Sequence, residues 1–266
     1  MGAWGYGLFQ GDHDLDVIAD LNYEIGLSEL EAQAKAKARA APGTEPSKTN
    51  DTKQTSEDKE EEDEDEFDRM IRYDLYGNAC SDPDAVREYL HNTDALPKLI
   101  AEYTTAFRNA KSVQHWYGPE YKLVILAACL MTLGCKLPAD LKKLVGKLYP
   151  HVGLMAEGQQ QMAKALTQYK EGDLWDFESL GLIDTANARD SSMGGGMNVM
   201  GVGTLFGAPP KAKSYPDELC GTCGSGADEG HGLPVCAKCK KRKYCDKDCQ
   251  RIHWGTHRKE CKKAEA

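Results

Sequence analysis

Hydrophobic residues in the middle of the chain recur with the spacing of α-helices. One stripe has the i, i+3, i+4, i+7, i+11 spacing of a single helix face and consists of Leu96, Leu99, Ile100, Tyr103 and Phe107. Such a stripe is typical of a helix that buries one side against a core. Ser81, Asp82 and Pro83 form a start signal for an earlier helix, because proline is favoured in the first helical turn.

The segment from Tyr121 to Leu133 is apolar on nearly every side. A helix with this composition belongs in the centre of a domain rather than on its surface. Pro119 and Gly134 supply its start and its end. We expect further helices after Pro138, with Leu141, Leu144, Val145 and Leu148 on one face, and over residues 154–169. No strand-like alternation stands out, so the fold class is mainly α, with five or six helices around one core.

The N-terminus begins MGAWGYGLFQGD, which suggests a tight loop whose aromatic side chains pack on that core. A helix should follow, capped by Asp12 and stopped by Gly26. Asp12, His13, Asp14 and Asp16 could together bind a divalent cation. Acidic residues more often occupy a helix N-terminus because the helix dipole favours negative charge there, and we favour that interpretation.

Two segments lack any apolar face. Residues 31–66 run from an Ala/Lys/Arg stretch into a block of nine acids in ten positions at 57–66. We expect a disordered acidic insertion, with an acidic docking tract as the alternative. Residues 191–215 form a Gly/Pro-rich linker. The predicted organisation is a helical domain made of 1–30 and 67–190, then the linker, then a C-terminal module at 216–263.

The C-terminal module holds seven of the ten cysteines, in four pairs with regular spacing. The pairs are Cys220-x2-Cys223, Cys236-x2-Cys239, Cys245-x3-Cys249 and His257-x3-Cys261. Seven thiols and one imidazole are the ligand count of two tetrahedral zinc ions. A segment as short as 220–261 cannot bury a sufficient core, so we expect two structural Zn²⁺ ions to hold it together.

Several alternatives remain open within this module. A disulfide framework would also use paired cysteines, but a CxxC series completed by histidine favours zinc. His253 and His231 could replace His257, whose spacing to Cys261 repeats that of the preceding pair. Spacing alone permits sequential or interleaved pairing of the ligands. The CxxC pairs predict two turns with short strands, and the x3 pairs predict two short helices.

The module resembles the MYND-type zinc finger from Cys220 to Cys261. Beyond the ligands, the resemblance includes Tyr244, Gln250 and Trp254. It implies an interleaved double-zinc cross-brace in which Cys220, Cys223, Cys245 and Cys249 hold zinc 1, and Cys236, Cys239, His257 and Cys261 hold zinc 2. It also implies a protein-recognition module, which in some members binds proline-containing peptides through positions matching Gln250 and Trp254. The alternative is that Trp254 fills the small core and Gln250 faces solvent.

The first residues are similar to an uncharacterised helical domain family that begins MGAWGxGxFxxD. That resemblance implies no activity, and the body shows no motif of a catalytic site. We therefore expect a zinc-dependent protein–protein interaction adaptor, not an enzyme, with transcriptional regulation as a candidate setting. The alternatives are an enzyme of unknown class in the body, whose substrate the finger recruits, and a nucleic-acid-associated regulator.

Composition narrows the partners and the location. The net charge of −9 argues against a nucleic-acid partner. Zinc thiolates are typical of a reducing compartment, so we expect the cytoplasm, the nucleus or both. Acidic residues stand where a secretory signal would be apolar, and the longest apolar stretch, 123–133, is short for a membrane span, so we expect no membrane association.

Overall fold

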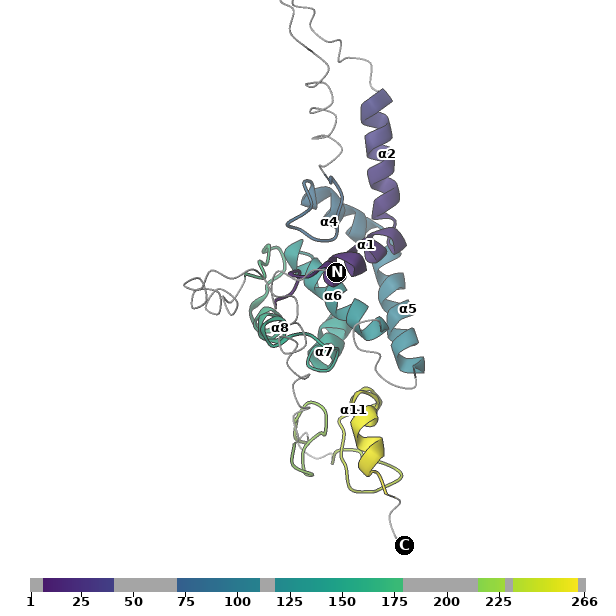
Figure 1. The fold of residues 1–266 in the computed structure, drawn as a ribbon, viewed down its shortest axis with the longest axis vertical. Coiled ribbons are helices and arrows are strands. Elements are labelled where there is room, and N and C mark those ends of the chain that lie inside the picture. The colour runs from purple at the N-terminus through teal and green to yellow at the C-terminus, as the bar shows by residue number, and fades with distance from the viewer. Residues whose placement is uncertain (1–6, 41–70, 111–117, 179–214, 228–231, 263–266) are drawn as a thin grey trace, which may run out of the picture.

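The computed structural model describes residues 7–40, 71–110, 118–178, 215–227 and 232–262 (Figure 1). Within these ranges helices are the main secondary structure, which confirms the predicted fold class. The helices are α1 (Asp12–Glu24), α2 (Leu27–Ala40), α4 (Pro83–Asn92), α5 (Ala95–Asn109), α6 (Pro119–Thr132), α7 (Ala139–Leu148), α8 (Ala156–Gln168) and α11 (Lys247–Glu260). The helices from α1 to α8 form a helical body, and α11 belongs to the C-terminal module.

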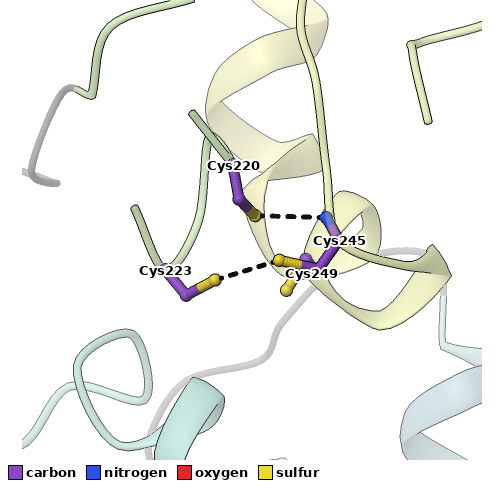
Figure 2. Close-up of side chains that lie close together, drawn as sticks. All are labelled: Cys220, Cys223, Cys245 and Cys249. Carbon is purple, nitrogen blue, oxygen red and sulfur yellow. Dashed lines mark hydrogen bonds between the residues drawn. The ribbon is translucent and has the colours of Figure 1, made fainter. Parts of the chain in front are cut away.

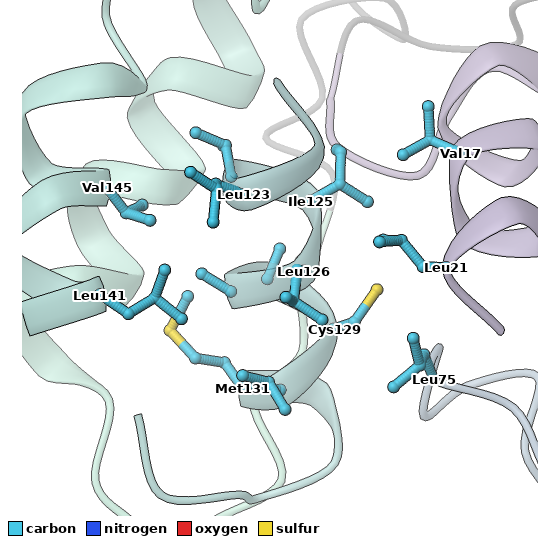
Figure 3. Close-up of a cluster of buried hydrophobic side chains, with 14 of the residues drawn as sticks. Val17, Leu21, Leu75, Leu123, Ile125, Leu126, Cys129, Met131, Leu141 and Val145 are labelled. Carbon is cyan, nitrogen blue, oxygen red and sulfur yellow. The ribbon is translucent and has the colours of Figure 1, made fainter. Parts of the chain in front are cut away.

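Helix α6 is the centre of the body, as its uniformly apolar sequence predicts. It packs against α1, α5 and α7, and nearly every side chain on it is buried. Figure 3 shows Leu126 and its α6 neighbours between side chains of α1, such as Val17, and side chains of α7, such as Val145. Burial on all sides explains why α6 shows no stripe, whereas α5 and α7 bury only the faces predicted from the sequence.

Two of the predicted helix boundaries are confirmed. The side chain of Asp82 accepts a hydrogen bond from the backbone N–H of Ala85 at 3.2 Å, with Pro83 as the first residue of α4. Gly26 follows α1 with φ +87°, a conformation that glycine adopts without strain. Its hydrogen also faces the Tyr89 hydroxyl, which would lie 2.9 Å from an added Cβ.

Asp12 is not the cap of α1. The N-cap position is Gly11, whose backbone is extended, and no side chain caps this helix. Asp14 instead is buried and accepts hydrogen bonds from the backbone N–H of Phe9, at 2.8 Å, and from the hydroxyl of Tyr121. The acidic cluster therefore contains one carboxylate that ties the N-terminal loop to α6. Burial raises the pKa of Asp14, although both hydrogen bonds oppose that shift.

The N-terminal loop packs on the core where the structure describes it. The ring of Phe9 lies 4.5 Å from the ring of Tyr76 and 5.5 Å from that of Phe177. Residues 1–6, which include two further aromatic residues of the predicted loop, lie outside the described residues.

The predicted start of the disordered insertion, at residue 31, lies within a helix. Residues 31–40 are the C-terminal part of α2, so the prediction is wrong for them. Their alanine, glutamine, lysine and arginine residues have high helix propensity, which sustains a helix without a continuous apolar face. Glu31 adds an ion pair with Lys35 and accepts the backbone N–H groups of Arg72 and Tyr73 at 3.0 and 2.8 Å. The acidic block at 57–66 and the linker residues 191–214 lie outside the described residues.

Among the described helices, none combines the length and the apolar composition that a bilayer crossing requires.

Candidate metal centre

The two CxxC segments form the same turn. The backbone N–H of Gly224 donates to the carbonyl of Cys220 at 3.0 Å, and that of Lys240 donates to the carbonyl of Cys236 at 2.9 Å. Each turn ends on a residue with positive φ, 73° at Gly224 and 57° at Lys240. Glycine adopts this conformation readily, whereas lysine rarely does. Lys240 follows the second pair at the position that Gly224 takes after the first, and this match is the only sign of its conformation in the sequence.

Two isolated β-bridges connect the CxxC turns. Lys243 forms isolated bridges, parallel with Cys220 and antiparallel with Val235. The predicted short strands are thus reduced to single-residue bridges. The buried Tyr244 follows, and its backbone N–H donates to the carbonyl of Pro234 at 2.9 Å. Lys243 therefore holds both CxxC turns beside the segment that carries the next ligand.

One helix, α11, replaces the two short helices predicted from the x3 pairs. It begins after Asp246, whose carboxylate accepts the backbone N–H of Cys249 at 2.9 Å. It continues through Gly255, where no neighbour lies within 4 Å of an added Cβ and no proline interrupts the helix. Cys249 and His257 lie on this helix, whereas Cys245 precedes it and Cys261 is its C-cap residue.

Four cysteines from three parts of the module converge in a first cluster. The sulfurs of Cys220, Cys223, Cys245 and Cys249 all lie within 4.8 Å of one another (Figure 2). The sulfurs of Cys223 and Cys245 are 3.4 Å apart, and the backbone N–H of Cys245 donates to the sulfur of Cys220 at 3.4 Å. Zinc–sulfur bonds of about 2.3 Å imply sulfurs about 3.8 Å apart around one ion, whereas bonded disulfide sulfurs are about 2.05 Å apart.

A second cluster contains Cys236, Cys239, His257 and Cys261, whose ligand atoms also lie within 4.8 Å of one another. The sulfurs of Cys236 and Cys261 are 3.8 Å apart, and Nε2 of His257 lies 3.5 Å from the sulfur of Cys239. His253, the competing histidine, instead places Nδ1 3.1 Å from the hydroxyl of Tyr244. His231 lies outside the described residues.

The thiols of the first cluster depend on a nearby cation to ionise together. Burial works to raise the pKa of Cys220, but backbone N–H groups, including those of Thr222 and Cys223, outweigh it and hold the pKa at about 7. Burial and then the neighbouring thiols raise the pKa of Cys245 to about 12. One thiolate forms readily and its presence disfavours the next, so a divalent cation is needed to compensate for the accumulated negative charge.

Both clusters fit a structural zinc ion. Each offers four protein ligands of the type that zinc prefers, in an arrangement compact enough for tetrahedral coordination. Filling all four positions with protein leaves no coordination site for water or substrate, which distinguishes structural from catalytic zinc. The module therefore has two sites that are each able to bind a zinc ion.

The comparison with protein families settles what this arrangement is. The family model described as the MYND finger matches residues 220–261. This segment is a MYND finger. The MYND finger is a zinc-binding protein-interaction module and is not catalytic. The structural grouping of its ligands is the interleaved one, with the two CxxC pairs assigned to different clusters. No solved structure matches the chain.

The two residues expected to bind a partner lie on the same face of α11, because they are four positions apart. Trp254 is half-buried and packs against the buried cysteine cluster of the finger, with its ring 6.0 Å from that of His257. Gln250 is also half-buried. Trp254 thus contributes to the finger core while retaining exposed surface that a partner could contact.

Proposed function

We propose that the protein is a non-enzymatic adaptor whose MYND finger binds an extended, proline-containing segment of a partner protein along Gln250 and Trp254. The observation that carries this proposal is the half-exposed Trp254 ring on a finger whose two metal sites are both closed by protein ligands. An aromatic ring held against a rigid core offers an apolar surface for proline at low entropic cost. A closed zinc site offers no position for catalysis.

The finger also has a backbone edge at Val235 that a peptide could pair with. The backbone of Val235 pairs with Lys243 through hydrogen bonds made by the residues on either side, Pro234 and Cys236. In this type of antiparallel pair, the N–H and carbonyl of Val235 itself point away from Lys243. Its side chain is 45 % exposed. An extended peptide could therefore add to this edge through backbone hydrogen bonds, while side-chain contacts supply selectivity.

A proline-scanned array of extended peptides, probed with the full-length zinc-loaded protein, tests the proposal. The wild-type protein should bind a subset of peptides, and replacing their prolines should abolish binding. Trp254→Ala and Gln250→Ala should weaken the strongest interaction, with Trp254→Ala costing about 2 kcal/mol, because aromatic anchors dominate such interfaces.

Zinc content distinguishes loss of a contact from loss of the fold. Native mass spectrometry should find two zinc ions in Trp254→Ala and Gln250→Ala. Thr256→Ala, at an exposed position of the same helix, is the matched control and should bind peptides as wild-type does. Equal capture by the wild-type and Trp254→Ala proteins, with zinc retained in both, would contradict the proposed site.

A further inference from the structure

The finger lies against the helical body rather than apart from it. Figure 1 shows α11 next to the ends of α5 and α7. Ile252 on α11 is only 7 % exposed and belongs to the same apolar cluster as the body core. The guanidinium carbon of Arg251 lies 5.7 Å from the ring centre of Phe107 on α5. The finger helix thus has an apolar anchor on the body.

Two ion pairs join the finger to the body at this contact. On α5, Arg108 donates to both carboxylate oxygens of Asp248, from Nε at 3.3 Å and from Nη2 at 3.0 Å. On α7, Lys147 pairs with Asp246. The side chains of Lys147 and Asp248 are only 12 % and 17 % exposed, so each pair has one member largely shielded from water. Shielding strengthens the Coulombic attraction within such a pair, and it makes the loss of one partner more costly than at a surface salt bridge.

Asp246 connects the body to the first metal site. One of its carboxylate oxygens caps α11 by accepting the backbone N–H of Cys249, and the other pairs with Lys147. Cys245 directly precedes Asp246, and both cysteines belong to the first cluster. The ammonium group of Lys147 therefore holds the carboxylate that fixes the backbone between two zinc ligands. Groups in this position behind the ligands commonly affect metal affinity strongly.

We propose that the body holds the finger in place through Lys147 and Arg108, and that this docking stabilises zinc in the site formed by Cys220, Cys223, Cys245 and Cys249. Linkage makes the effect reciprocal: zinc in that site strengthens docking by the same factor by which docking strengthens zinc binding. The second site receives less support, because within the described residues both ion pairs between finger and body lie at the N-terminal end of α11.

This inference goes beyond the proposed function and does not depend on it. Asp248 and Ile252 are four residues apart and share the face of α11 that meets the body. Gln250 is two residues from each, which places it about 200° around the helix from Asp248. The proposed partner face is therefore directed away from the docked face, so docking orients the finger without covering Gln250 and Trp254.

Zinc release from the full-length, zinc-loaded protein into a chromogenic chelator tests the proposal. Lys147→Ala should speed release of one of the two ions about 10-fold and leave the other unchanged. Alkylation at intermediate times, followed by mass spectrometry, identifies which cysteines lose zinc first; these should be the four of the first site. Lys147→Arg should release zinc as slowly as wild-type, because it retains the positive charge. Lys143→Ala, at an exposed position one turn earlier on α7, is the matched control.

A charge swap separates docking from a local effect on α7. Arg108→Asp should also speed release from the first site, and adding Asp248→Arg should slow it again, because the swap restores opposite charges across the contact. The proposal is overturned if Lys147→Ala releases zinc no faster than wild-type or speeds both sites equally. It is also overturned if Lys143→Ala produces the same acceleration, or if the double variant is no slower than Arg108→Asp.

Discussion

The body and the finger of this chain are held together by different interactions. In the body, α6 is surrounded by apolar side chains from three other helices, and removal of that apolar surface from water stabilises the fold. In the finger, the buried cluster consists of Tyr244 and five cysteines. All five cysteines belong to the two metal sites, so their main contribution to stability is metal binding and not apolar packing. The finger therefore depends on a metal where the body depends on packing.

The same difference is visible where two helices begin. Asp82 caps α4 and Asp246 caps α11, each by accepting a backbone N–H three residues ahead. Asp82 also pairs with Arg72, whose side chain is 56 % exposed, so its cap is a local stabilising feature at the surface. Asp246 stands between two zinc ligands and pairs with a largely buried lysine from the body. An identical capping interaction thus has local consequences in the body and reaches the metal site in the finger.

Removing zinc should produce the largest effect and should separate the two regions. Chelation is expected to unfold α11 and the two CxxC turns, because structural zinc contributes about 10–16 kcal/mol in zinc-finger peptides. The helices α1 to α8 should remain folded on their own core. Circular dichroism during chelation should therefore show a partial loss of helical signal, corresponding to α11 alone. A concerted loss of the whole signal would mean that the two regions share one source of stability.

A cavity in the body should have the next largest effect and should leave the metal in place. Leu126 on α6 is fully buried, so Leu126→Ala should lower the free energy of unfolding of the body by about 2–5 kcal/mol. Urea denaturation followed by circular dichroism measures this change, and native mass spectrometry should still find two zinc ions. Leu174→Ala, at a leucine that is 61 % exposed, is the matched control and should change little. Loss of zinc in Leu126→Ala would show that the body core supports the finger more broadly than through α11.

The helices and the metal sites were predictable because each is encoded within short stretches of sequence. The apolar stripe of α5, the uniformly apolar α6 and the start of α4 at Asp82 all follow from the spacing of a few residues. The eight candidate zinc ligands follow in the same way from regular intervals between cysteines and from the matching interval between His257 and Cys261. Their interleaved grouping required the family resemblance, because spacing alone permits either pairing.

The features that sequence reasoning missed depend on tertiary context or on competing local preferences. The continuation of α2 through residues 31–40 rests on helix propensity and on Glu31, which accepts N–H groups from residues 72 and 73. The positive φ of Lys240 is imposed by the turn, not by the preference of lysine. The contact of Ile252 with the body joins residues far apart in the chain, and a single hydrophobic position on α11 does not reveal what covers it.

Acidification should weaken zinc binding by the finger but increase the stability of the body. The change in the body should be the smallest of the effects predicted here. In the finger, protons compete with zinc for thiolates, so lowering the pH from 7 towards 5 should favour zinc release. In the body, burial raises the pKa of Asp14 and of Asp74. A carboxyl group whose folded-state pKa is raised contributes stability that is present below its usual value, 3.8, and is lost as the pH rises through the folded-state value. These two groups should therefore stabilise the body as the pH falls.

Asp14→Asn isolates that contribution in the chelated protein, where the finger no longer affects the measurement. Asparagine can still accept the N–H of Phe9 and can donate to the hydroxyl oxygen of Tyr121, so the buried contacts of Asp14 can be retained. Between pH 7 and pH 5, the urea midpoint of wild-type should gain more, or lose less, than that of Asp14→Asn. The difference should be smaller than the effect of Leu126→Ala. The exposed Asp16→Asn is the control on the same helix. If Asp14→Asn and wild-type respond identically to pH, the buried carboxylate is not a source of the pH dependence, and the contrast between the two regions would then rest on zinc alone.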